Sequence, residues 1–107
     1  MAVSLITDSE FLSELSVQNN IVVKYFTDWC GSCRLFRPKF IKLSEDKQYS
    51  NVRFLDVNAE DNPIARKMAN ITHFPAFAIF KNGVFISSFT TTNEDLVIEL
   101  IKKLQNQ

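Results

Sequence analysis

Hydrophobic and polar residues follow two different periods along this chain, one typical of strands and one typical of helices. Residues 21–26 are β-branched or aromatic apart from Lys24, a composition typical of strands. Residues 52–57 and 76–80 are also mainly apolar and are predicted to be strands as well. Between these runs, apolar residues recur every three or four positions, which indicates helices that bury one face. The pattern therefore predicts strands that alternate with helices.

The first half of the chain adds a short edge strand at 5–6 and two helices. Thr7 or Asp8 can cap the first helix. The second helix carries apolar residues between positions 35 and 43 and contains Pro38. Proline removes one backbone hydrogen bond, so we expect it to kink this helix without abolishing it.

The second half contains a short helix and a hairpin. Asn62-Pro63 is an N-cap followed by proline at the first helical position, which predicts a helix at 64–69 that ends at Asn70. Asn82-Gly83 predicts a type I′ turn, followed by a returning strand at 84–86.

The predicted order of elements is β-α-β-α-β-α-β-β-α, and Asn93 can cap the last helix. We expect strands separated by helices to run parallel by crossover and the final hairpin to be antiparallel. The predicted fold class is therefore α/β, with one domain spanning residues 1–107, a mixed central sheet and helices on both faces.

Composition narrows the classes of function. The chain has 107 residues, a hydrophobic fraction of 46%, and 12 basic against 12 acidic side chains. That hydrophobic fraction excludes a disordered chain, and the balanced charge gives no basic surplus for nucleic acid. The first residues show no basic region and no long apolar run, so we expect a soluble cytosolic protein with no membrane segment.

The only two cysteines, Cys30 and Cys33, lie two residues apart in the stretch "DWCGSCR". Cys30 follows a predicted strand and opens the next helix, where free N–H groups and the helix dipole lower the pKa of a thiol. Cys33 lies one turn farther on and can resolve a mixed disulfide by intramolecular attack. Gly31 lets another backbone come close, and Trp29 can shield one side of the pair.

The two cysteines allow two other interpretations. A CxxC pair is half of a tetrahedral zinc site, but His73 is the only other soft ligand in the chain, so we expect no metal within one chain. A metal shared between two chains stays open. Two unreactive buried cysteines would not explain a position between a strand and a helix.

The cysteine segment and a second motif together resemble the thioredoxin family. A strand, then "WCGSC", then a helix with Pro38 five residues past Cys33 is one half of the resemblance. The other half is "FPAFAIFKNG", with Pro75 just before a strand. The resemblance covers essentially the whole chain in element order and length, and it implies the thioredoxin fold.

The resemblance also implies roles for individual residues. Cys30 would be the nucleophile and Cys33 the resolving cysteine of a redox-active disulfide, with no bound cofactor. Pro75 would be the family's cis-proline, which faces the cysteines and receives an extended substrate backbone. Phe74 and Ala76 would border that groove, although Phe74 fits the core equally well.

The chain departs from the family at three positions. Ser32 stands where thioredoxins usually have proline, and a hydroxyl near the thiolate would stabilise the reduced form and make the disulfide more oxidising. Thr91 falls where the family usually has glycine. It either narrows the substrate rim or belongs to a β-rich loop. Lys24 replaces a buried aspartate that is thought to help move the proton of the resolving cysteine.

The side chain of Lys24 has three interpretations. We expect its stem to pack and its ammonium to reach solvent. A buried Lys24 could instead act as a neutral base, or as a cation that favours the thiolate. Asp28, Asp56 and Glu60 are alternative carboxylates for proton transfer, with Asp28 expected at the solvated rim.

We predict a thiol–disulfide oxidoreductase that reduces protein disulfides. The chain lacks a dinucleotide fingerprint, so a separate enzyme must reduce it, and the resemblance implies thioredoxin reductase. The implied clients are peroxiredoxin, methionine sulfoxide reductase or ribonucleotide reductase, and the protein is expected to be a monomer. The alternatives are a disulfide isomerase or oxidase, or a binding module with dispensable cysteines.

Overall fold

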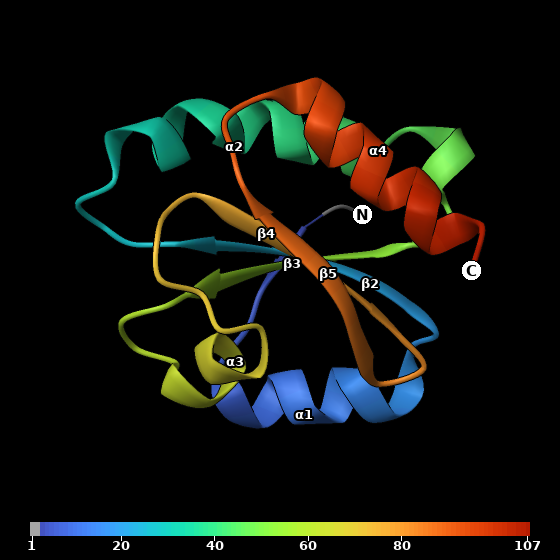
Figure 1. The fold of residues 1–107 in the computed structure, drawn as a ribbon, viewed down its shortest axis with the longest axis horizontal. Helices are drawn as coiled ribbons and strands as arrows, with labels where there is room; N and C mark the ends of the chain where they lie inside the picture. Colours follow the sequence, from blue (N-terminus) through green and yellow to red (C-terminus); the bar gives the residue numbers. More distant parts are fainter. Residues whose placement is uncertain (1–2) are drawn as a thin grey trace.

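The computed structural model describes residues 3–107, which form a five-stranded sheet with helices on both faces (Figure 1). In chain order the elements are β1 (Ser4–Leu5), α1 (Asp8–Val17), β2 (Asn20–Phe26), α2 (Gly31–Ser44), the short 3-10 helix η1 (Lys47–Tyr49), β3 (Arg53–Asn58), α3 (Pro63–Met68), β4 (Ala76–Lys81), β5 (Val84–Thr90) and α4 (Glu94–Gln105). The predicted order of strands and α-helices is confirmed, and the 3-10 helix is an addition to it. No helix among residues 3–107 is both long and apolar enough to cross a membrane.

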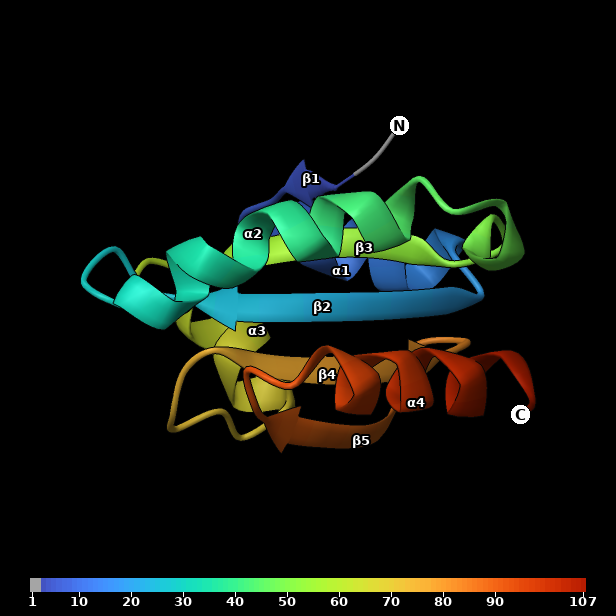
Figure 2. The ribbon, with the colours of Figure 1, turned by 90° about the horizontal axis from the view of Figure 1, so that it is seen from above.

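The sheet has the strand order β1-β3-β2-β4-β5, so β2 lies at its centre (Figure 2). β1 and β2 run parallel to β3, whereas β4 runs antiparallel to both β2 and β5. The sheet is mixed, as predicted.

The direction of β4 corrects one prediction, because β3 and β4 are separated by a helix and yet run in opposite directions. A helix of 6 residues such as α3 is about 9 Å long. A strand of 6 residues such as β3 is about 20 Å long. Helix α3 alone therefore does not span the length of β3, and the connection does not carry the chain back to the start of that strand. The chain re-enters the sheet where it left, with Ala76 paired to Tyr25 near the end of β2.

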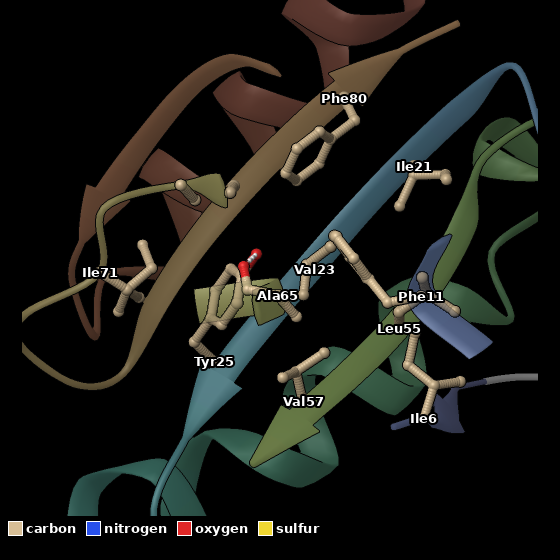
Figure 3. Close-up of a cluster of buried hydrophobic side chains, with 13 residues drawn as sticks. Ile6, Phe11, Ile21, Val23, Tyr25, Leu55, Val57, Ala65, Ile71 and Phe80 are labelled. Carbon is tan, nitrogen blue, oxygen red and sulfur yellow. Dashed lines mark hydrogen bonds between the residues drawn. The ribbon is translucent and has the colours of Figure 1, made fainter. Parts of the chain in front are cut away.

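Side chains of β2 point alternately to two hydrophobic layers. Ile21, Val23 and Tyr25 pack with Phe11 of α1 and Ala65 of α3 on one face (Figure 3). On the other face, Val22 packs in the layer formed by α2 and α4, whose buried members include Phe36, Phe40, Val97, Leu100, Ile101 and Leu104. The alternation places Lys24 on this second face, beneath α2.

Local signals in the sequence mark the turns correctly. Asn70 has a φ of 54°, and Asn82 and Gly83 have φ values of 51° and 83°, the left-handed conformations that a helix end and a type I′ turn require. Helix α2 continues through Pro38. Strand β5 extends beyond the predicted residues 84–86 to Thr90.

The cap of α3 differs from the prediction. Asn62 occupies the N-cap position, but its side chain makes no capping hydrogen bond to that helix. The carboxylate of Asp8 caps α3 instead, accepting hydrogen bonds from the backbone N–H groups of Ile64 at 3.1 Å and Ala65 at 2.8 Å. Asn62 Oδ1 accepts from the backbone N–H of Asp8 at 2.9 Å, so the starts of α1 and α3 are joined in both directions.

Candidate active site

Cys30 and Cys33 form a disulfide at the start of α2, just past the end of β2. Cys30 is the N-cap residue of that helix and Cys33 lies in its first turn. Both residues are buried. The predicted position between a strand and a helix is confirmed.

Two hydrogen-bonding groups surround the sulfur of Cys30. The backbone N–H of Cys33 donates to Cys30 Sγ at 3.2 Å, and the hydroxyl of Ser32 lies 3.5 Å from the same sulfur. Donors at a helix N-terminus stabilise negative charge, so this environment favours a thiolate on Cys30 after reduction. At Gly31, a Cβ would meet no atom within 4 Å, so its surroundings are open to an approaching chain.

The segment before β4 forms one side of the site. The peptide bond between Phe74 and Pro75 is cis, as the resemblance implied. Phe74 packs edge-on against Trp29, with their ring centroids 5.9 Å apart. Phe74 is half-buried and packs against the core cluster, which was one of the two settings expected for it.

Trp29 is less of a shield than predicted, because 66% of its surface is exposed. Its indole Nε1 donates to Glu60 at 2.9 Å, which fixes the ring beside Phe74. The exposed Trp29, with the half-buried Phe74 packed against it, forms an apolar rim beside Cys30 that suits contact with another protein.

Thr91 lies beside the cis-proline. Its backbone N–H donates to the carbonyl of Pro75 at 3.1 Å, and its hydroxyl accepts from the backbone N–H of Asn93 at 2.9 Å. The side chain of Thr91 is therefore engaged in the loop that leads to α4. Ala76, the first residue of β4, is buried.

Lys24 corrects another prediction, since its ammonium does not reach solvent. The side chain is only 3% exposed, and Nζ lies 3.4 Å from Asp56 Oδ1 on β3. The same ammonium stands over the rings of Phe26 at 5.7 Å and Phe40 at 5.6 Å. Helix α2 covers this face of the sheet, so the side chain ends at an anionic partner and two aromatic faces instead of at the surface.

Burial acts on both members of this ion pair. Desolvation lowers the pKa of Lys24, and the negative charge of Asp56 opposes that change. Desolvation also raises the pKa of Asp56, and the positive charge of Lys24 opposes it. Each charge therefore favours the ionised form of its partner, and burial opposes it.

A cavity of about 310 Å³ lies behind the disulfide. Its walls come from β1, β2, β3, the loop after β2, and the first turns of α2. The lining residues are Leu5, Lys24, Phe26, Thr27, Asp28, Cys33, Arg34, Arg37 and Asp56. Cys33 therefore shares one cavity with the ion pair, which spacing along the chain does not reveal.

The other two carboxylates proposed from the sequence are both exposed to solvent. Asp28 is exposed at the rim, as expected, and its Oδ1 accepts from Asn58 Nδ2 at 3.3 Å. Glu60 is exposed and bound to Trp29.

A metal centre has no support from the part of the chain that the structure describes. No group of three or more His, Cys, Asp or Glu side chains is placed there to hold a metal ion. The imidazole Nδ1 of His73 lies 2.9 Å from the hydroxyl of Thr72. The arrangement around Cys30 and Cys33 is that of a redox-active disulfide.

Comparison with known proteins gives consistent matches. The family model for thioredoxin matches residues 2–103. The chain is 33% identical to human thioredoxin over 84 residues, which cover 78% of each chain. Among solved structures, spinach chloroplast thioredoxin f superposes with a TM-score of 0.89 at 27% identity, covering 97% of this chain and 94% of that one.

A second solved structure is similar over 95% of both chains, with a TM-score of 0.84 and 25% identity. It comes from work on the thiol resolving mechanism of yeast mitochondrial 1-Cys peroxiredoxin via glutathione and thioredoxin systems.

Proposed function

The chain belongs to the thioredoxin family, and on that premise we propose that it carries electrons from a separate thioredoxin reductase to the disulfides of client proteins. It is a thiol–disulfide oxidoreductase of the protein-disulfide reductase type. The observation that carries this function is the Cys30–Cys33 disulfide at the start of α2, directly after the exposed Trp29.

In the proposed cycle, Cys30 is the nucleophile. Its thiolate attacks one sulfur of a client disulfide, so that a Cys30–client bond forms and the other client sulfur leaves as a thiolate. Cys33 then attacks Cys30 Sγ, the intramolecular disulfide forms, and the second client thiolate leaves. Two electrons have passed from the dithiol to the client, whose thiolates take up protons.

The client is proposed to bind along the segment Phe74-Pro75-Ala76. This segment precedes and begins β4 and packs against Trp29, the residue before Cys30. An extended client backbone could lie along it and bring a disulfide to Cys30. The loop at Thr91, tied to the carbonyl of Pro75, would border the same groove and influence which clients fit.

The proposed partners follow from the family. A flavin-dependent thioredoxin reductase would regenerate the dithiol, and the candidate clients are peroxiredoxin, methionine sulfoxide reductase and ribonucleotide reductase. The solved structure from work on a 1-Cys peroxiredoxin supports placing peroxiredoxin first. We also propose a cytosolic location and roles in electron transport and redox homeostasis, because a reducing compartment keeps such a dithiol reduced.

Reduction of insulin by dithiothreitol tests the function. The protein should accelerate the precipitation of insulin chains, and Cys30→Ser should not. A Cys33→Ser variant should retain the first step and accumulate a mixed disulfide with the client that mass spectrometry detects. If the wild-type protein does not accelerate the reaction, the reductase function is wrong.

A further inference from the structure

The cavity behind Cys33 is lined by two buried oxygen atoms that form no hydrogen bond within residues 3–107. They are the hydroxyl oxygen of Thr27 and Oδ1 of Asp56, and the latter has the ammonium of Lys24 at 3.4 Å as its ion-pair partner. Both residues line the cavity. Buried polar atoms nearly always have a hydrogen-bond partner, and a cavity of about 310 Å³ with polar atoms in its wall is large enough to admit water. Water admitted to this cavity would supply the hydrogen bonds that both oxygens lack.

The charges around the cavity identify which group can accept a proton. Lys24 from β2 faces Asp56 from β3, Arg34 and Arg37 extend from α2, and Asp28 lies in the loop after β2. Lys24 is cationic when paired with a carboxylate and then has no lone pair to offer. Asp56 is the only carboxylate lining the cavity that is not exposed to solvent.

We propose that Asp56 is the proton acceptor for Cys33, acting through water in this cavity, and that Lys24 is the counter-ion that keeps Asp56 ionised. This inference rests on the proposed function and assigns a step within it. The carboxylate comes from β3 rather than from position 24 of β2, where the family usually has an aspartate. The two strands thus carry the carboxylate and the ammonium at directly paired positions.

The proton and electrons balance in the following way. In the mixed disulfide between Cys30 and a client, the thiol of Cys33 passes its proton through water to the carboxylate of Asp56. The resulting thiolate attacks Cys30 Sγ, the Cys30–Cys33 bond forms, and the Cys30–client bond breaks. The client leaves as a thiolate, and Asp56 returns its proton through water to that thiolate or to solvent.

Two alternative carboxylates are less suitable. Asp28 lines the same cavity but is exposed, and a solvated carboxylate is a weaker base than a partly desolvated one. Glu60 does not line the cavity and accepts the indole N–H of Trp29. Asp28→Asn is therefore the matched control, since it removes a carboxylate from the same cavity.

A single-turnover reaction with an aromatic disulfide, 5,5′-dithiobis(2-nitrobenzoate), separates the two steps. Each step releases one coloured thiolate: attack by Cys30 gives the first phase, and resolution by Cys33 gives the second. At pH 7, Asp56→Asn should slow the second phase by about 10-fold or more and leave the first phase within about 2-fold. Above pH ~9, where an ordinary thiol ionises unaided, the second phase should approach the wild-type rate.

Three further variants make the result decisive. Asp28→Asn should leave both phases within about 2-fold of wild type, and Asp56→Glu should recover most of the second phase. The double variant Lys24→Met, Asp56→Asn removes both charges together, which spares the fold an unpaired buried ion, and its second phase should be as slow as that of Asp56→Asn. A wild-type second phase at pH 7 in Asp56→Asn or in the double variant would overturn the proposal. The proposed function would survive that result, because the first phase and insulin reduction by the wild-type protein report the redox activity itself.

Discussion

Lys24 and Asp56 stand opposite each other on the neighbouring parallel strands β2 and β3, with Nζ of the lysine 3.4 Å from Oδ1 of the aspartate. The side chains are 3% and 15% exposed. A pair this deeply buried has lost most of its hydration, and its mutual attraction offsets that loss only while both partners are present.

Removing one partner should therefore cost much more than removing both. We expect Lys24→Met to lower the free energy of unfolding at pH 7 by roughly 3 kcal/mol, because an ionised Asp56 is left without its counter-ion. The double variant Lys24→Met, Asp56→Leu should be about as stable as wild type or more stable. Urea unfolding of the wild type, Lys24→Met, Asp56→Leu and the double variant measures the coupling energy of the pair. Equal losses in Lys24→Met and the double variant would contradict this expectation.

The loss in Lys24→Met should also depend on pH. Without the lysine, only burial and the more distant Arg37 act on Asp56, so its pKa in the folded protein is raised further above the unfolded value. A carboxyl with a raised folded pKa contributes its full stability below the unfolded pKa and loses it as pH rises through the folded pKa. The variant should therefore lie closest to wild type near pH 4 and fall progressively behind between pH 4 and 7. A difference that is constant over this range would rule out Asp56 as the cause.

Ser32 is expected to raise the reduction potential of the disulfide. Its hydroxyl lies 3.5 Å from Cys30 Sγ, where it can donate to the thiolate of the reduced form. One such hydrogen bond contributes about 0.5–1.5 kcal/mol, so Ser32→Pro should make the disulfide more reducing by roughly 10–30 mV. Equilibration with a glutathione buffer measures the potential.

The Ser32→Ala variant separates the hydroxyl from the stiffness that proline adds. Ser32→Ala should show most of the shift in reduction potential expected for Ser32→Pro, since both variants lose the hydroxyl that donates to the Cys30 thiolate. An unchanged or more oxidising potential in Ser32→Pro would reject the role given to this hydroxyl.

Asp8 is expected to stabilise the fold through a helix other than its own. Its carboxylate accepts the first N–H groups of α3, from Ile64 and Ala65. Asp8→Ala should lower the free energy of unfolding by about 1–2 kcal/mol, the usual cost of losing a charged cap. Asp8→Asn keeps one oxygen acceptor and should recover part of this loss. Denaturant unfolding that shows no difference between wild type and Asp8→Ala would argue against the cap.

Tyr25 joins β2 to α3 through its hydroxyl, which donates to the carbonyl of Ala65 at 2.9 Å (Figure 3). Tyr25→Phe should cost about 1–2 kcal/mol of unfolding free energy, because the carbonyl of Ala65 is left buried without its donor. Burial raises the pKa of Tyr25 well above its usual range. Burial also raises the pKa of the other tyrosine, Tyr49. Spectrophotometric titration of the folded wild type should therefore show both phenols ionising at higher pH than after unfolding, and the contribution of Tyr25 should be missing in Tyr25→Phe.

The sequence predicts the elements well because their signals are local. Alternation along β2 separates Ile21 and Val23 from Val22, and this is enough to predict two buried faces. A type I′ turn requires positive φ angles at both central positions, and Asn82-Gly83 is a pair that adopts them readily. The position of Cys30 between a strand and a helix is similarly visible, so the redox pair and its place at a helix start follow from neighbouring residues alone.

The direction of β4, the burial of Lys24 and the cap on α3 depend instead on distances through space. The path of the chain through α3 brings Ala76 back beside Tyr25, so that β4 runs antiparallel to β2. Strand pairing decides that Lys24 meets Asp56, 32 positions later in the chain, and packing of α2 above them excludes solvent. Asp8 reaches Ala65 because α1 and α3 begin side by side.

The sequence by itself therefore determined the order of elements and the redox-active cysteines, because hydrophobic period, turn chemistry and CxxC spacing act within a few residues. Only the tertiary structure decided which charged groups share a cavity with Cys33. Burial, ion pairing and the raised pKa of Asp56 arise from groups on β2, β3 and α2 that the fold brings together.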